Sequence, residues 1–238
     1  MDLRSKTQNS YVNRATYYNN KTDWVTKCKC IDPLVPSVYG RGVALDVCSG
    51  TGEISNALIN KGWTVISVDL SRNMLQINVN PLRLICDMHN LPFEKNMFDL
   101  VVCRQGLQYA DINLALNEFV RVGISKIRLG HITKESNDNY DFWKNYFEIA
   151  SPGRIHILEP NQICELAQSI GLRTFLLNIF RQRDSYLGPI MHLPKQNITY
   201  LINLLSNTSE EFKKIYGVKK DNNEIVYSNR WEFLEINF

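Results

Sequence analysis

The chain has 238 residues, of which 44% are hydrophobic and 21% charged, and its net charge is +3 at pH 7. This composition is ordinary for a globular enzyme, and the length suits one domain of the larger kind with room for a lid. Because the charge is small and no run is dominated by Lys and Arg, the sequence argues against a nucleic-acid-binding protein.

The N-terminus (MDLRSK) is polar and lacks the apolar segment of a signal peptide. No apolar run approaches the ~20 residues of a membrane-spanning helix, so we expect a cytoplasmic protein without a membrane partner. The six cysteines include one CxC pair, Cys28 and Cys30, with no second pair at metal-ligand spacing. We therefore expect reduced thiols and no metal site.

Residues 1–40 are polar, then aromatic, then contain prolines, and they precede the first core strand. We interpret them as an N-terminal helical flap that carries Tyr11, Tyr17, Tyr18 and Trp24. Pro33 and Pro36 indicate the linker into a second unit, residues 41–238.

From residue 41 onward, strand and helix patterns alternate. Strands are predicted over 43–47, 64–68, 82–86, 98–103, 126–133, 173–181 and 224–236, and helices over 53–61, 72–79, 111–122 and 161–170. This alternation predicts an α/β fold: a Rossmann-like, doubly wound, mostly parallel seven-stranded sheet with helices on both faces. Two segments interrupt it, 137–153 and 184–218, and we expect both to be inserts that cover the ligand site, the later one as a lid.

The first strand is followed by a glycine turn that opens directly into a helix. Residues 43–47 (VALDV) are short and apolar, as a buried parallel strand should be. Gly50 and Gly52 permit a tight backbone turn. The helix that follows would offer free backbone N–H groups to a polar ligand at the carboxyl end of the strand.

Polar residues also follow the next three strands, at the edge where open α/β sheets bind ligands. Asp69 is placed to accept hydrogen bonds from two ribose hydroxyls, and Asp87 with Met88 suits an adenine ring. Arg104 and Gln105 follow the fourth strand. A solvated carboxylate at a strand end is the alternative for each Asp. Asp46, two residues ahead of the turn, would repel a pyrophosphate but attract a cationic ligand.

Four segments in this order resemble the class I S-adenosylmethionine-dependent methyltransferases, of the small-molecule, methyltransferase-11/25-like type. They are LDVCSGTG (45–52), VDLSRNML (68–75), CDMHNLPF (86–93) and FDLVVC (98–103), and the match runs from about residue 43 to 122. The resemblance implies S-adenosyl-L-methionine as cofactor. The sequence departs from the family at 121–126 (RVGISK), where a Pro-Gly-Gly turn is common.

The resemblance also implies roles for individual residues. Asp46 and the backbone of Gly50 and Gly52 would hold the methionyl part. Asp69 would hold the ribose, and Asp87 and Met88 the adenine. Cys48 and Leu70 are further candidates for cofactor binding. Arg104 and Gln105 would border the methionyl part or the acceptor.

The sulfonium already makes the methyl carbon electrophilic, so the enzyme mainly places the acceptor and removes a proton where one is carried. His131, at the end of the fifth strand, is our candidate base, ahead of His156; His89 and His192 are expected to be bystanders. Arg104 and Tyr18 complete the candidate catalytic group. The alternative for the aromatic residues of the flap is that they only pack against the sheet.

We therefore predict a monomeric or homodimeric methyltransferase that acts on a small-molecule N-, O- or C-nucleophile. Two alternatives stay open at this point. One is a related enzyme that moves the aminocarboxypropyl group or cyclises the cofactor with release of methylthioadenosine. The other is a subunit that binds the cofactor without turnover.

Overall fold

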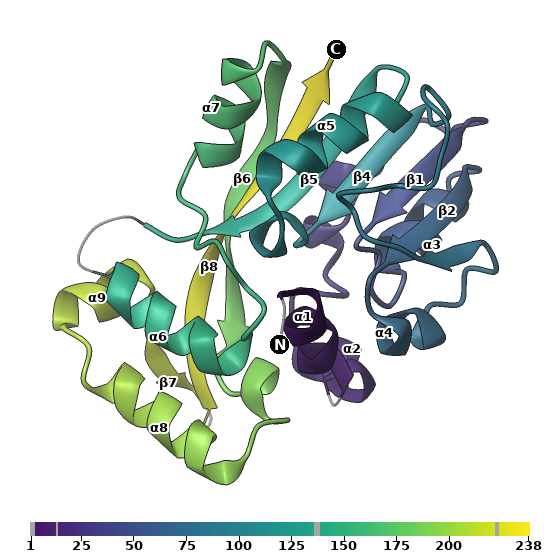
Figure 1. Ribbon diagram of the computed structural model, residues 1–238. Coiled ribbons are helices and arrows are strands. Elements are labelled where there is room, and N and C mark those ends of the chain that lie inside the picture. Colours follow the sequence, from purple (N-terminus) through teal and green to yellow (C-terminus); the bar gives the residue numbers. More distant parts are fainter. Residues whose placement is uncertain (1–2, 13, 136–138, 222–223) are drawn as a thin grey trace.

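The computed structural model describes residues 3–12, 14–135, 139–221 and 224–238. Within these ranges, eight strands form one sheet in the order β3-β2-β1-β4-β5-β8-β6, with the short β7 paired to β8 (Figure 1). The strands are β1 (Val43–Val47), β2 (Thr64–Asp69), β3 (Arg83–Ile85), β4 (Leu100–Arg104), β5 (Lys126–Thr133), β6 (Arg173–Ser185), β7 (Lys219–Asp221) and β8 (Glu224–Asn237).

The predicted fold class is confirmed, but the predicted count of seven strands is wrong. β1 to β5 pair in parallel, whereas β8 pairs antiparallel with β5, β6 and β7. The additional strand is β7, whose three residues (KKD) are polar and show no strand pattern. It forms because β8 extends past the sheet and offers an edge on which this short segment can pair.

The longer helices also follow the expected order. They are α1 (Leu3–Val12), α3 (Glu53–Ile59), α4 (Arg72–Ile77), α5 (Ile112–Val122), α6 (Tyr140–Ala150), α7 (Gln162–Ser169), α8 (Lys195–Ser206) and α9 (Glu210–Ile215), with a single-turn α2 (Tyr18–Lys21). Ser71 and Asp111 accept hydrogen bonds from the backbone N–H groups of Met74 and Leu114, and so begin α4 and α5 as N-caps. None of the described helices is long and apolar enough to cross a bilayer.

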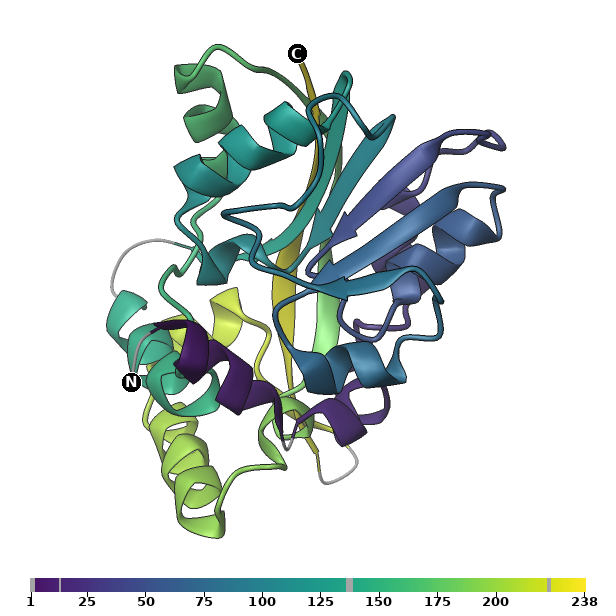
Figure 2. The same cartoon turned by 45° about the vertical axis from the view of Figure 1, so that its right-hand side comes forward.

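The sheet has a hydrophobic core on each face because successive residues of a strand point to opposite sides. Leu45 and Val47 belong to the core under α5 and α7, whereas Ala44 packs on the other side with Ile54 and Leu58 of α3. The two views show these helices on opposite sides of the sheet (Figures 1 and 2).

The second half of the N-terminal segment belongs to the core on the α3 side of the sheet. Trp24, Val25, Cys30 and Leu34 are buried there, beside Trp231 of β8. Trp24 and Trp231 lie with ring centroids 5.2 Å apart. Residues 24–34 are therefore a fixed cover of the sheet, and only the part before them, α1 and α2, lies across the carboxyl ends of the strands (Figure 2). Residues 1, 2 and 13 of the expected flap lie outside the described ranges.

The two expected inserts form one aromatic cluster beside the sheet. Trp143 and Tyr146 of α6 pack with Leu201 and Leu205 of α8 and Phe212 of α9. The long strands β6 and β8 run out of the sheet into this cluster, which we call the lid (Figure 1). Residues 137 and 138 of the first insert lie outside the described ranges.

Candidate functional site

The glycine turn after β1 has the backbone conformation that its sequence predicts. Gly50 has a φ of 53° and Gly52 a φ of 92°, and Cys48 also has a positive φ of 57°. A Cβ atom on Gly52 would lie 2.4 Å from Oδ1 of Asn78, so both its conformation and its neighbour require glycine. Gly52 is the N-cap of α3 and shapes the turn.

Asp69 joins the end of β2 to this turn. One carboxylate oxygen accepts a hydrogen bond from the Gly50 N–H at 2.9 Å, and the other accepts one from the Ser71 N–H at 2.7 Å. Burial raises the pKa of Asp69, while these N–H groups oppose that shift by stabilising the charged form. Each carboxylate oxygen has a second lone pair, so two further donors can bind here.

Asp46 lies beneath the turn and is 1% exposed. Its Oδ2 accepts a hydrogen bond from the Ser55 hydroxyl at 2.6 Å, and that hydroxyl lies 2.6 Å from the hydroxyl of Ser67. Burial raises the pKa of Asp46 to about 7, against the Ser55 hydrogen bond and the positive charge of Arg104. Its charge therefore changes near neutral pH and responds to a cationic group beside it.

Asp87, after β3, has partners on two sides. It accepts hydrogen bonds from the backbone N–H of His89 at 2.9 Å and from the His89 ring Nδ1 at 2.6 Å, and it forms an ion pair with Arg4 of α1 at 2.6 Å. The Nε2 of His89 accepts from the Asp111 N–H at 2.9 Å, so the proton of a neutral His89 is on Nδ1. His89 therefore orients Asp87.

Arg104 ends β4 and reaches the N-terminal segment. Its guanidinium donates to the carbonyls of Val25 at 2.9 Å and Cys30 at 3.3 Å, and lies 5.2 Å from the ring centre of Trp24. Burial lowers the pKa of Arg104, and the nearby Tyr18 and Asp46 oppose this shift. Gln105, the next residue, has a φ of 57°.

These groups surround one pocket, which we call the cofactor pocket. It contains about 1040 Å³ of space between the protein atoms, the open mouth included. Of the expected site residues, it is lined by Tyr18, Asp46, Cys48, Gly50, Asp69, Leu70, Asp87, Met88, Arg104 and Gln105. Gly52 and His131 are not among the residues that line it.

The polar groups of this pocket fit S-adenosylmethionine. Three carboxylates lie at the carboxyl ends of three adjacent parallel strands, Asp46 within β1, Asp69 as the last residue of β2 and Asp87 just after β3, so hydrogen-bond acceptors are spread along the pocket. Met74 and Met88 add apolar surface for a ring. The Gln105 Nε2 atom is buried and has no hydrogen-bond partner within the described ranges, so a ligand acceptor can bind there.

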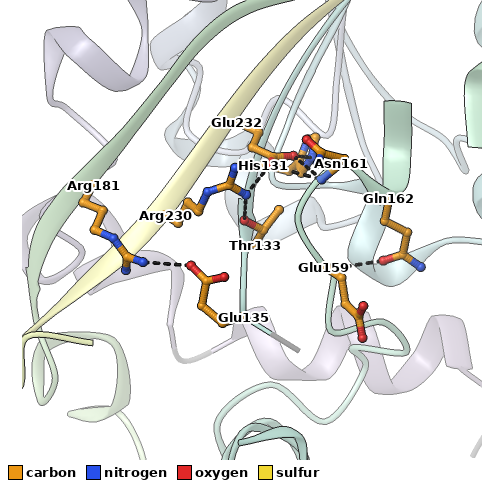
Figure 3. A network of polar contacts seen from close by, with 9 residues as sticks. All are labelled: His131, Thr133, Glu135, Glu159, Asn161, Gln162, Arg181, Arg230 and Glu232. Carbon is orange, nitrogen blue, oxygen red and sulfur yellow. Dashed lines mark hydrogen bonds and ion pairs between the residues drawn. The ribbon is translucent and has the colours of Figure 1, made fainter. Parts of the chain in front are cut away.

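His131 lies elsewhere, in a polar network between β5 and β8 (Figure 3). It is 2% exposed, and its Nε2 lies 3.4 Å from Glu232, its cross-strand neighbour. Glu232 also accepts from the backbone N–H of Asn161 and contacts Arg230. Burial raises the pKa of Glu232, but His131 and the other partners outweigh it and hold the pKa below its usual value. This placement is that of a structural residue, and it gives no support to a role as base.

The other three histidines give no clear candidate for a base either. His156 donates from Nε2 to the Ala110 carbonyl at 2.9 Å. His192 has a pKa lowered to about 4, chiefly by burial and also by Arg14. None of the four histidines except His89 lines either of the two pockets described for this region.

The flap residues cover the cofactor pocket. Tyr11, Tyr18 and Trp24 line it, and α1 spans its mouth, where Gln8 donates to the Leu70 carbonyl at 3.1 Å. Asn19 of α2 donates to Glu53 at 2.8 Å and accepts from Thr51 at 2.7 Å, so α2 is tied to the glycine turn.

A second pocket of about 580 Å³ adjoins the first. The two share five lining residues, Tyr11, Tyr18, Trp24, Gln105 and Tyr109, and the second extends under the lid. Its cationic residues Arg14, Lys134 and Arg154 were not singled out by the sequence, because they come from three distant segments without a motif. Tyr109 was within reach of sequence analysis, since it lies in the loop after the fourth strand.

Comparison with known proteins locates the family relationship in the same segment. Residues 45–126 match the family model described as "Methyltransferase domain". Over this segment the chain is similar to the class I S-adenosylmethionine-dependent methyltransferases.

This methyltransferase domain is also what the chain shares with curated relatives. A demethylmenaquinone methyltransferase of Oceanobacillus iheyensis is 38% identical over 99 residues, which cover 36% of this chain and 42% of that protein. A ubiquinone/menaquinone biosynthesis C-methyltransferase of Wigglesworthia glossinidia brevipalpis is 36% identical over 77 residues, 27% of this chain and 31% of that protein. The chain thus spans less than half the length of these relatives.

Solved structures share the fold over more of the chain. The YcgJ protein of Bacillus subtilis matches with a TM-score of 0.75 at 16% identity, over 84% of this chain and 93% of that one. A phosphoethanolamine N-methyltransferase of Haemonchus contortus matches with a TM-score of 0.64 at 17% identity, over 100% of this chain and 60% of that one. At these identities the likeness concerns the fold of the methyltransferase domain.

Proposed function

We propose that this protein transfers a methyl group from S-adenosylmethionine to a small-molecule acceptor. The observation that carries the proposal is the pair of adjoining pockets at the carboxyl ends of the parallel strands. One pocket carries the carboxylates of Asp46, Asp69 and Asp87, and the other extends under the lid behind a shared boundary of aromatic and amide side chains. A cofactor and an acceptor need such neighbouring compartments.

In this proposal the cofactor lies along the strand ends. Asp69 and Leu70 hold the ribose, Asp87 and Met88 hold the adenine, and the turn at Gly50 contacts the methionyl part. Asp46 attracts the methionyl ammonium, and Arg104 binds the methionyl carboxylate. Support comes from their common pocket and from the opposite charges of Asp46 and Arg104, each of which favours the charged form of the other.

S-adenosylmethionine, when bound, supplies a methyl carbon that its sulfonium already makes electrophilic. The chain's residues then have to orient the acceptor and exclude water. Tyr11, Tyr18 and Trp24 cover the boundary between the pockets and serve this purpose. Burial raises the pKa of Tyr18 to about 12, so its hydroxyl stays protonated and acts as a hydrogen-bond donor that positions the acceptor.

Where the acceptor must lose a proton, Tyr109 is better suited than His131 to take it. Tyr109 lines both pockets. Burial alone would raise the pKa of Tyr109, but the positive charges of Arg14 and Arg154 outweigh burial and hold the pKa below its usual value. A general base works best when its pKa approaches the working pH, and this shift is in that direction.

The named relatives favour methyl transfer over the alternatives of aminocarboxypropyl transfer, cofactor cyclisation and a subunit without turnover. They do not name one acceptor, since one is a demethylmenaquinone and another a phosphoethanolamine methyltransferase. We propose a small acceptor bound by a monomer or homodimer in the cytoplasm, with no role for nucleic acid. The small net charge of +3 supports the last point.

The first test is binding of S-adenosylhomocysteine, measured by titration calorimetry. The Asp69→Ala variant should lose about tenfold or more in affinity, because two hydrogen bonds to a charged acceptor are removed. Asp141→Asn, which changes a carboxylate of α6 outside the cofactor pocket, should bind as the wild type does. Equal affinity of Asp69→Ala and wild type would overturn the cofactor site.

The second test identifies the reaction by mass spectrometry of the products formed from S-adenosylmethionine. Incubation with pools of small amines, acids and phenols should yield S-adenosylhomocysteine together with one acceptor whose mass rises by a methyl group. Release of methylthioadenosine would overturn methyl transfer in favour of the other chemistry of the same cofactor.

A further inference from the structure

The second pocket has an unusual charge. Three cationic side chains line it, Arg14 before α2, Lys134 after β5 and Arg154 after α6, and no Asp or Glu is among the described residues that line it. The remaining surface is formed by aromatic, aliphatic, amide and hydroxyl groups, among them Tyr146 and Tyr227. Gathering buried and half-buried like charges is costly unless an opposite charge joins them.

Lys134 has only neutral partners in this space. It is 2% exposed, its ammonium donates to the Asn229 side-chain carbonyl at 2.5 Å, and it lies 3.5 Å from the centre of the Trp143 ring. Asn229 in turn donates to Asp184 at 2.6 Å, so the nearest acidic group is reached only through an amide. Burial, with a contribution from Arg154, holds the pKa of Lys134 well below its usual range.

The two arginines are incompletely paired. Arg154 lies 3.8 Å from the ring centre of Phe147 and donates from Nε to the His156 carbonyl at 2.9 Å, but one of its NH2 groups is buried without a partner within the described ranges. Arg14 makes one long hydrogen bond to Ser151 at 3.4 Å, and its Nε is likewise buried and unpaired there. An unmade hydrogen bond of a buried charged donor is costly, so a water, an ion or a ligand acceptor is expected beside such a group.

We propose that the second pocket binds an anionic group of the acceptor, a carboxylate or a phosphate, between Arg14, Lys134 and Arg154. An anion there supplies the missing counter-charge and accepts from the unpaired guanidinium donors, which match the planar or tetrahedral oxygens of such groups. The inference rests on the proposed methyl transfer and names the acceptor class: a small acid whose nucleophilic atom lies on the cofactor side of its anionic group.

The position of the shared residues supports this orientation. Tyr109 lies between the two pockets, with its hydroxyl 3.1 Å from that of Tyr11 and 3.3 Å from Ser151. A molecule anchored by its anionic end under the lid therefore presents its other end toward Tyr109 and the cofactor pocket. The aromatic rings of Tyr146 and Phe147 would flank the part between the two ends.

The test uses protein saturated with S-adenosylhomocysteine and titrates it separately with inorganic phosphate and with acetate, at constant ionic strength. Saturable binding of at least one anion is expected with a dissociation constant in the millimolar range; a dissociation constant of about 1 mM corresponds to a binding free energy of about 4 kcal/mol. The Arg154→Gln and Lys134→Met variants should each weaken it about tenfold. Arg173→Gln, an exposed cation of β6 outside both pockets, is the matched control and should bind as the wild type does.

The outcomes separate this inference from the proposed function. Unchanged S-adenosylhomocysteine affinity in the Arg154→Gln variant shows that its fold and cofactor pocket are intact. If the wild type binds S-adenosylhomocysteine but shows no saturable anion binding up to about 50 mM, or if Arg173→Gln weakens anion binding as much as Arg154→Gln, the anion site is overturned while the cofactor site stands. If the wild type fails to bind S-adenosylhomocysteine, the proposed function itself fails.

Discussion

At the scale of single residues, the buried carboxylates are the most informative groups. Asp46 is almost fully buried yet its main partner is the neutral hydroxyl of Ser55. Asp184, on β6, is buried beside the neutral amide of Asn229. Burial raises the pKa of both to about 7. They differ in location, because Asp46 lines the cofactor pocket and Asp184 lines neither pocket.

The stability of the protein should therefore depend on pH between the ordinary carboxyl pKa of 3.8 and about 7. The folded state binds more protons than the unfolded state in this range, so the free energy of unfolding falls as pH rises. Each group contributes up to about 1.4 kcal/mol per pH unit. Asp46→Asn and Asp184→Asn should each reduce this slope in urea denaturation experiments at several pH values.

Only one of the two variants should also change ligand binding. Asp46→Asn should weaken S-adenosylhomocysteine binding and flatten its pH dependence near neutrality, because the ligand's ammonium favours the charged carboxylate. Asp184→Asn is the matched control for the same kind of buried group. A slope in Asp46→Asn equal to that of the wild type would contradict the raised pKa.

His131 offers a second prediction at this scale. In His131→Gln, the buried Glu232 loses a partner that stabilises its charge, so the free energy of unfolding should fall by about 1–3 kcal/mol. S-adenosylhomocysteine affinity should stay within about twofold, since His131 does not line the cofactor pocket. Glu135→Gln, which removes a more exposed ion pair with Arg181, should cost less. Loss of turnover without loss of stability in His131→Gln would restore it as a catalytic candidate.

At the scale of elements, α1 and α2 are held over the cofactor pocket by polar contacts. The ion pair of Arg4 and Asp87 has an Arg4 side chain that is 67% exposed, so it contributes little stability on its own. Gln8 and Asn19 add hydrogen bonds to Leu70, Thr51 and Glu53. Such a cover can open at small cost and close again over a ligand.

Ligand binding should therefore slow amide hydrogen exchange in α1. With saturating S-adenosylhomocysteine, exchange in α1 and in the turn at residues 48–53 should slow about tenfold, as closed states are populated. Exchange in α8, which packs in the lid away from the cofactor pocket, should change much less. Unchanged exchange in α1, measured by mass spectrometry, would contradict its role as a cover.

At the scale of the whole molecule, the described residues form three hydrophobic clusters. Two lie on opposite faces of the sheet, and the third is the aromatic lid on the extended ends of β6 and β8. The second pocket lies where the lid meets the strand ends, because Lys134 from β5's end and Tyr146 from α6 line it together. The lid and the second pocket are thus linked through Trp143, which contacts Lys134.

The Trp143→Ala variant should separate lid packing from cofactor binding. Removing this fully buried ring should lower the free energy of unfolding by about 3–5 kcal/mol and weaken anion binding in the second pocket. S-adenosylhomocysteine affinity should be retained. Leu205→Ala changes a residue of α8 in the same cluster. It should cost about 2–5 kcal/mol of unfolding free energy while anion binding stays unchanged. Equal anion binding in the Trp143 and Leu205 variants would contradict the coupling.

The sequence by itself determined the strands β1 to β6 and β8 and most of the residues that line the cofactor pocket. Strands such as Val43–Val47 are short, mostly apolar runs bounded by turn residues. The glycine turn, Asp69 and Asp87 lie at strand ends that parallel pairing must bring to one edge. These features are local, or follow from local features by the topology of βαβ units, so periodicity and motif spacing reveal them.

Only the tertiary structure decided what lies around that pocket. It places His131 where β5 pairs with β8, and it buries Trp24 and Leu34 in the core. It also brings Arg14, Lys134 and Arg154 together around the second pocket. The physical reason is that these positions depend on contacts between segments far apart in the chain, where neither helix nor strand periodicity carries information. Sequence motifs identify the cofactor here, and the packing of distant segments shapes the second pocket.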